Sequence, residues 1–90
     1  MKTTYYVGID MASATFVASL VTAKVEPQGE ATQFANEPTG YEQFTKWLLE
    51  QGATQAETAL CLEATGVYGE ELAYWLQTKG WWLAVLPPPE

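Results

Sequence analysis

Two acidic residues stand where strands of this chain are expected to end. Asp10, the single aspartate, closes the segment 4–9, and Glu63 closes the apolar segment 58–62. Ligands in open α/β sheets gather at the carboxyl ends of strands, and neighbouring strands lie only about 5 Å apart. Two carboxylates that close repel each other unless they share a cation or hold a proton. Mg²⁺ binds through one or two carboxylates plus substrate phosphates. The pair therefore predicts half of a metal site for phosphoryl chemistry.

A plainer interpretation of both acids stays open. An aspartate at a strand end often accepts hydrogen bonds from turn amides, and a glutamate before a helix often offsets the helix dipole. Thr65 and Tyr68 could contact a phosphate at a helix start, although capping and packing explain them equally well. With Ser13 and Gly66 they form a weaker set of candidate contacts to nucleic acid or phosphate.

Composition narrows the function classes. The chain has 90 residues, of which 48% are hydrophobic, so it predicts one folded domain. It contains no histidine, which excludes Ser-His-Asp hydrolases, Cys-His proteases and histidine-ligated zinc enzymes. One cysteine, Cys61, allows no internal disulfide, and we interpret it as an inert core thiol. The four tryptophans are interpreted mainly as core or interface residues rather than as base-stacking platforms.

Charge and hydropathy bear on partners and location. A formal net charge of −7 repels phosphate backbones, so these residues alone lack the basic surface of a nucleic-acid binder. The longest apolar run, residues 81–86, is far shorter than a membrane span. No targeting segment is visible. We expect a cytoplasmic protein without a membrane partner.

The local patterns predict the element order β-β-β-α-β-α-β. The expected strands are 4–9, 15–21, 29–34, 58–62 and 82–86, with residues 29–34 at the sheet edge. One helix is expected over 40–51, started by a capping box of Thr39 and Glu42 and closed by Gly52. A second helix is expected to open at Gly66 and close at Gly80. If both crossovers step the same way, both helices cover one face of a mixed sheet and leave the other face bare.

Several of these residues together resemble a known family. Val7-Gly8-Ile9-Asp10, Thr15-Phe16, Asn36, Gly40 and Trp47-Leu48 are part of the pattern. Its most specific part is the run 63–69, Glu-Ala-Thr-Gly-Val-Tyr-Gly, followed by Leu72, Leu76 and Gly80. Over nearly the whole chain the sequence resembles the amino-terminal domain of DEDD-type transposases, the insertion-sequence family one-ten enzymes related to pilin-gene invertases.

The resemblance implies a ribonuclease H-like fold of the RuvC type, an α/β fold with a mixed five-stranded sheet in the order 3-2-1-4-5. In this family four acidic residues bind a divalent metal, Mg²⁺ or Mn²⁺, during DNA cleavage and joining. By position Asp10 matches the first acid and Glu63 the second. The other two acids and a serine-bearing domain lie in the family beyond residue 90. We therefore expect residues 1–90 to be a truncated catalytic domain, with the carboxyl-terminal part of the fold missing and no activity alone.

The resemblance also implies partners: DNA, and a guide RNA as a further candidate, through the full-length protein. One local departure is that Met11-Ala12-Ser13-Ala14 stands where the family usually has Ser-Lys after the first aspartate. Without that lysine, residues 11–14 offer no cationic side chain for a phosphate near Asp10.

Two other functions remain as alternatives. A non-enzymatic interaction or inhibitory domain is compatible with the sequence, and a bare apolar sheet face predicts self-association. An actin-like or sugar-kinase ATPase lobe is disfavoured, because no glycine follows Asp10 within residues 11–14 to build a phosphate-cradling turn.

Overall fold

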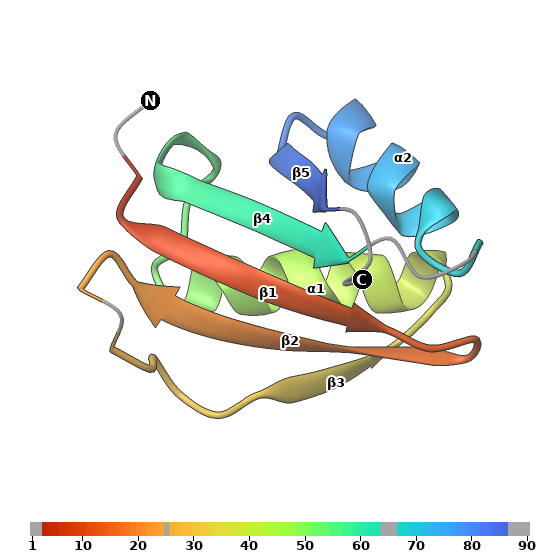
Figure 1. The fold of residues 1–90 in the computed structure, drawn as a ribbon, viewed down its shortest axis with the longest axis horizontal. Coiled ribbons are helices and arrows are strands. Elements are labelled where there is room, and N and C mark those ends of the chain that lie inside the picture. The colour runs from red at the N-terminus through yellow and green to blue at the C-terminus, as the bar shows by residue number, and fades with distance from the viewer. Residues whose placement is uncertain (1–2, 25, 64–66, 87–90) are drawn as a thin grey trace.

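The computed structural model describes residues 3–24, 26–63 and 67–86 and contains one sheet and two α-helices (Figure 1). The strands are β1 (Tyr5–Met11), β2 (Thr15–Thr22), β3 (Thr32–Ala35), β4 (Thr58–Glu63) and β5 (Trp82–Leu86). The helices are α1 (Pro38–Glu50) and α2 (Glu70–Thr78), with a short 3-10 turn at Gln55–Glu57.

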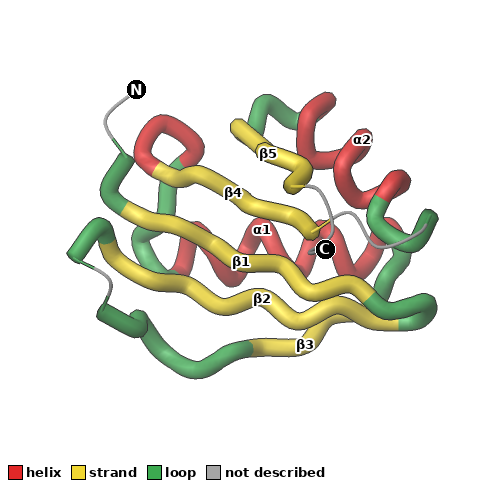
Figure 2. The backbone as a smooth tube through the Cα atoms, in the orientation of Figure 1, coloured by secondary structure: helices red, strands yellow, loops and turns green. Residues whose placement is uncertain are grey.

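The five strands form one mixed sheet in the order β3-β2-β1-β4-β5 (Figure 2). β2 is antiparallel to β1 and to β3, whereas β1, β4 and β5 run parallel to one another. The sheet order and the edge position of β3 confirm the expectations from the sequence. β3 is shorter than expected because Gly29 turns with a φ of 75°, and an isolated bridge joins Val21 to Pro27 before the ladder with β2 begins.

The expected start of α1 was wrong. Glu37 is the N-cap residue, Pro38 occupies the first helical turn, and no side chain caps the helix. Proline is favoured there because its missing amide hydrogen is not needed and its φ is already helical. Thr39 and Glu42 therefore lie inside the helix and form no capping box. The predicted end is confirmed, since Gly52 follows the helix with a φ of 87°.

The expected start of α2 is only partly testable. Gly66 lies outside the described residues, and within them the helix begins at Glu70 with Gly69 as N-cap. Gly80 follows the helix with a φ of 93°, as expected for a residue that ends it.

A single hydrophobic core lies between one sheet face and both helices. Side chains of β1 alternate strictly, so Val7, Ile9 and Met11 are buried and the residues between them are exposed. Phe44 of α1 and Leu76 of α2 belong to the same buried cluster, so both helices cover the same face. Figure 1 looks onto the opposite face, with α1 behind the sheet. The described elements leave that face uncovered, as the sequence predicted.

Candidate functional site

Asp10 and Glu63 lie side by side at the carboxyl ends of two neighbouring parallel strands. The β1–β4 ladder ends at the pair Ile9 and Leu62, so the two acids follow at the next position of the same register. Ile9 and Leu62 face the core. Because side chains alternate along a strand, Asp10 and Glu63 both face the uncovered side of the sheet. The geometry therefore brings together the two acids that the sequence singled out.

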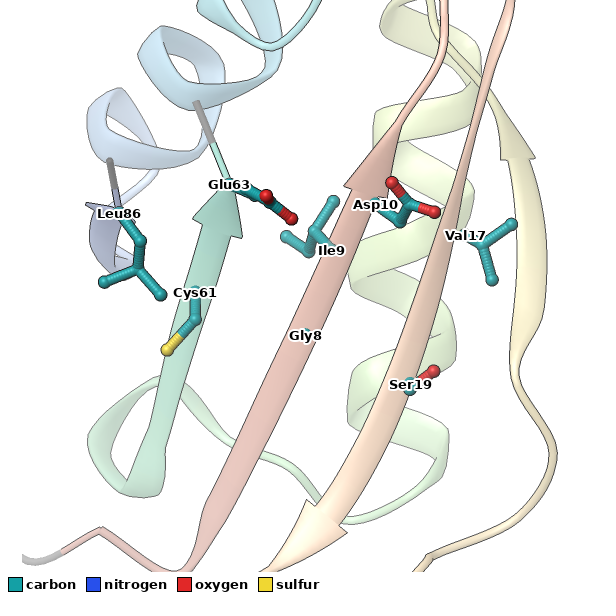
Figure 3. Close-up of a pocket in the computed structure, with 8 residues that line it drawn as sticks. All are labelled: Gly8, Ile9, Asp10, Val17, Ser19, Cys61, Glu63 and Leu86. Carbon is teal, nitrogen blue, oxygen red and sulfur yellow. The ribbon is translucent and has the colours of Figure 1, made fainter. Parts of the chain in front are cut away.

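Both acids line a shallow depression of about 400 Å³ in the uncovered sheet face (Figure 3). Its lining residues are Gly8, Ile9, Asp10, Val17, Ser19, Cys61, Glu63 and Leu86. Gly8 forms its floor between Ser19 and Cys61, its partners on either side. A Cβ on Gly8 would meet no atom within 4 Å, so the missing side chain leaves open space two residues from Asp10.

The carboxylates point in different directions. Figure 3 shows Glu63 reaching from β4 toward β1, and the Asp10 carboxylate leaning toward β2. Glu63 is half-buried and Asp10 is exposed. The described residues that line the depression include no lysine or arginine, so no basic side chain there offsets the two negative charges.

This donor set fits a hard divalent cation as a partial site. Mg²⁺ prefers oxygen ligands, keeps several waters and uses one or two carboxylates. Across the described ranges no three acidic or cysteine side chains gather closely enough to hold an ion together. Asp10 and Glu63 would therefore supply part of the coordination, with water or other groups supplying the rest.

Of the four weaker candidates, Ser13 and Tyr68 lie within the described residues. Thr65 and Gly66 lie outside the described residues. Ser13 is exposed in the hairpin between β1 and β2, and its backbone carbonyl accepts a hydrogen bond. Tyr68 is 49% exposed, and its backbone carbonyl likewise accepts a hydrogen bond.

Asn36 makes both of those hydrogen bonds, and sequence reasoning gave it no role beyond the family resemblance. Its Nδ2 donates to the carbonyl of Tyr68 at 3.0 Å, of Ser13 at 3.3 Å and of Ala12 at 3.4 Å. Its Oδ1 accepts from the Tyr41 hydroxyl at 2.7 Å. The three carbonyls are 23 to 32 residues away in sequence, so no local pattern could have revealed them.

The Tyr41 hydroxyl remains a donor over the whole physiological range. Burial, followed by the negative charges of Glu71 and Glu37, raises the pKa of Tyr41 to about 12. The ring is fully buried and packs against Phe16 and Trp75. The neutral hydroxyl donates to the Asn36 amide oxygen and thereby orients the amide.

Cys61 and the tryptophans partly depart from the sequence interpretation. Cys61 is half-buried and lines the depression instead of lying in the core. Trp81 is in the core and Trp47 and Trp75 pack against it, as expected, whereas Trp82 is 52% exposed. Trp82, the first residue of β5, pairs with Ala59 of β4 and belongs to the uncovered face.

The fold indicates the class of protein. A mixed five-stranded sheet in the order 3-2-1-4-5, with two helices on one face, is the arrangement of a ribonuclease H-like domain. The chain belongs to the DEDD transposases of the insertion-sequence family one-ten: the model of that family, described as a transposase, matches residues 7–90.

Curated relatives agree with this family. The chain is 34% identical over 70 residues to a pilin gene-inverting protein of Moraxella lacunata and 33% identical over 70 residues to one of Moraxella bovis. These alignments cover 78% of this chain but 21% of each relative. The chain therefore spans about a fifth of the length of the curated relatives it matches. Among the described residues no helix is long and apolar enough to cross a membrane.

Proposed function

We propose that Asp10 and Glu63 are two of the acidic metal ligands of a DNA transposase that cleaves and joins DNA strands. One observation carries this proposal: both acids occupy the same register position of neighbouring parallel strands and face the same side of the sheet. An acidic residue that ended a strand without any function would not require a second acid beside it on the neighbouring strand. The family membership supports the same chemistry.

The chain's residues would hold a cation and leave room for substrate. Asp10 and Glu63 supply the negative charge, and Gly8 keeps the floor of the depression open beside them. When bound, a divalent ion of this kind, Mg²⁺ or Mn²⁺, activates the attacking oxygen and neutralises charge on the phosphate. A net charge of −7 opposes the approach of a DNA backbone, and a bound cation would offset part of that charge.

We further propose that residues 1–90 are the amino-terminal part of a larger catalytic domain and are inactive alone. Two carboxylates are too few for the four-acid site that the family resemblance implies. DNA, with a guide RNA as a further candidate, would be engaged by the full-length protein. Ser13 and Tyr68 are exposed at the same end of the sheet and remain candidates for weak phosphate contacts.

The test is a Mn²⁺ titration of the 90-residue chain followed by NMR. Paramagnetic broadening is expected to centre on the amides around Asp10 and Glu63 and to disappear in Asp10→Asn and in Glu63→Gln. Glu42→Gln, an exposed acid on α1, is the matched control and should change nothing. Broadening spread evenly over all acidic residues, or unaffected by Asp10→Asn, would count against the metal site. Nicking of supercoiled plasmid by this chain with Mn²⁺ would contradict its inactivity alone.

A second function is favoured by the apolar character of the uncovered face. Tyr6, Trp82 and Leu86 are 42%, 52% and 48% exposed, and all three lie on that side of the sheet. Exposed apolar patches commonly mark protein interfaces. We propose that this face also mediates self-association or acts as an interaction or inhibitory surface. A chain that stays monomeric in sedimentation up to high concentration would rule out the self-association.

A further inference from the structure

Asn36 connects three segments of the chain by hydrogen bonds, at the end of the sheet where Asp10 and Glu63 lie. It follows β3, and its backbone amide donates to the carbonyl of Ala14 at 2.9 Å. Its side chain reaches the carbonyls of Ala12 and Ser13, in the hairpin turn that follows β1. The same amide reaches the carbonyl of Tyr68, between β4 and α2. Figure 1 shows the hairpin and the starts of both helices together at this end.

The orientation of the amide follows from its partners. Carbonyl oxygens can only accept, so the Nδ2 group must face Ala12, Ser13 and Tyr68. The Oδ1 atom then faces Tyr41, whose hydroxyl donates at 2.7 Å. Tyr41 is anchored in the core with a relative exposure of 0%, which ties the amide to a rigid part of the molecule.

Each of the two segments joined by Asn36 lies within a few residues of an acidic strand end. Ala12 and Ser13 come two and three residues after Asp10, and Tyr68 comes five residues after Glu63. Gly69 adds a second tie between the same segments. A Cβ on Gly69 would lie 2.9 Å from a methyl carbon of Leu62 and 3.3 Å from Cγ of Met11. The backbone before α2 therefore packs directly on the ends of both strands.

We propose that Asn36 is a positioning residue for the acid pair. By joining the turn after Asp10 to the segment before α2, its amide holds the ends of β1 and β4 in the arrangement in which both carboxylates bind one divalent cation. Asn36 does not touch the cation itself. This inference rests on the proposed metal-binding function of Asp10 and Glu63. Residues that orient metal ligands without binding the metal themselves typically change metal affinity by about 10- to 100-fold when they are mutated.

The experiment measures Mn²⁺ affinity of the 90-residue chain at low temperature, where NMR dispersion reports that each variant is folded. Asn36→Ala is expected to weaken Mn²⁺ binding by about 10-fold or more. Tyr41→Phe, which removes only the hydroxyl that orients the amide, is expected to weaken it less. Gln55→Ala is the matched control, because Gln55 ties two segments through a 2.9 Å bond to the Lys79 carbonyl at the other end of the sheet. It should leave Mn²⁺ affinity unchanged.

Each outcome decides the inference. Folded Asn36→Ala that binds Mn²⁺ as tightly as the wild type overturns it, and so does an equal loss in Gln55→Ala, which would reflect destabilisation alone. If Asn36→Ala does not fold, Tyr41→Phe decides in its place. The wild type and Asp10→Asn are compared first: Mn²⁺ binding that Asp10→Asn leaves unchanged removes the proposed function and this inference with it. Asp10-dependent binding that Asn36→Ala and Tyr41→Phe leave unchanged removes this inference only.

Discussion

Gly40→Ala is expected to destabilise the fold although it replaces a glycine in a helix. A Cβ on Gly40 would lie 1.9 Å from the Ala35 carbonyl oxygen and 2.7 and 2.9 Å from the Ala35 carbonyl carbon and nitrogen. All three atoms are backbone, so no side chain can rotate away. Removing this clash requires α1 and the end of β3 to separate by about an ångström, and protein interiors are too densely packed to allow that without cost.

The magnitude follows from two opposing terms. Alanine gains about 0.5–1 kcal/mol over glycine within a helix, whereas overpacking costs about 1–3 kcal/mol and sometimes more. The Ala35 backbone cannot retreat easily, because Ala35 pairs with Thr15 and the next residue, Asn36, is tied through its side chain. We expect a net loss of about 2 kcal/mol, which lowers the melting temperature of a domain of this size by about 8–16 °C.

Urea unfolding followed by circular dichroism measures this loss, and Gly8→Ala is the matched control. Gly8 also lies within a regular element, but a Cβ there meets no atom within 4 Å. Alanine at Gly8 should therefore be neutral or slightly stabilising, since glycine weakens a strand. A Gly40→Ala chain as stable as the wild type, or more stable, would refute the reasoning from the Ala35 contact.

Three further predictions concern stability and association. Folding raises the pKa of Tyr41 from 10.0 to about 12, so the stability that its neutral hydroxyl contributes is present below pH 10 and is lost as the pH rises to about 12. Between these pH values the free energy of unfolding should fall less steeply with pH in Tyr41→Phe than in the wild type. Equal slopes in the two proteins would contradict this. Leu48→Ala should cost about 2–5 kcal/mol, whereas Leu49→Ala, at a side chain 56% exposed, should cost little in the same urea measurement. Trp82→Glu should weaken self-association, measured as the concentration dependence of sedimentation. Tyr74→Glu, at a residue of α2 that is 72% exposed, should leave self-association unchanged. Equal effects of the two substitutions would argue against association through the uncovered face.

Much of the fold could be predicted because short apolar runs and turn residues are local signals. The strand 58–62 differs from the observed β4 only by its last residue, Glu63. The start of α1 could not be placed correctly, because Thr39 and Glu42 fit a capping box while Pro38 competes for the same position. Two local patterns overlap here, and the helix follows the proline, which is favoured in a first helical turn.

The adjacency of the two acids could be predicted from the sequence, but the hydrogen bonds of Asn36 could not. Asp10 and Glu63 could be found because each follows a run of apolar residues. Asn36 could not, because its partners are backbone carbonyls, which any sequence provides. Cys61 was placed in the core because both its neighbours are leucines. In the structure Leu60 and Leu62 face the helices, and the alternation of the strand turns Cys61 to the other face.

The register of β1 with β4 explains why the two acids meet. Tyr5 pairs with Thr58 at the start of the ladder, and Asp10 and Glu63 each follow five residues later. The register is maintained by core-facing side chains, since Val7 pairs with Leu60 and Ile9 with Leu62. A slip by one residue would turn the leucines of β4 to the uncovered face and Glu63 toward the core. The burial of these leucines and the pairing of the carboxylates therefore depend on the same register, so the hydrophobic core that stabilises the fold also builds the acid pair.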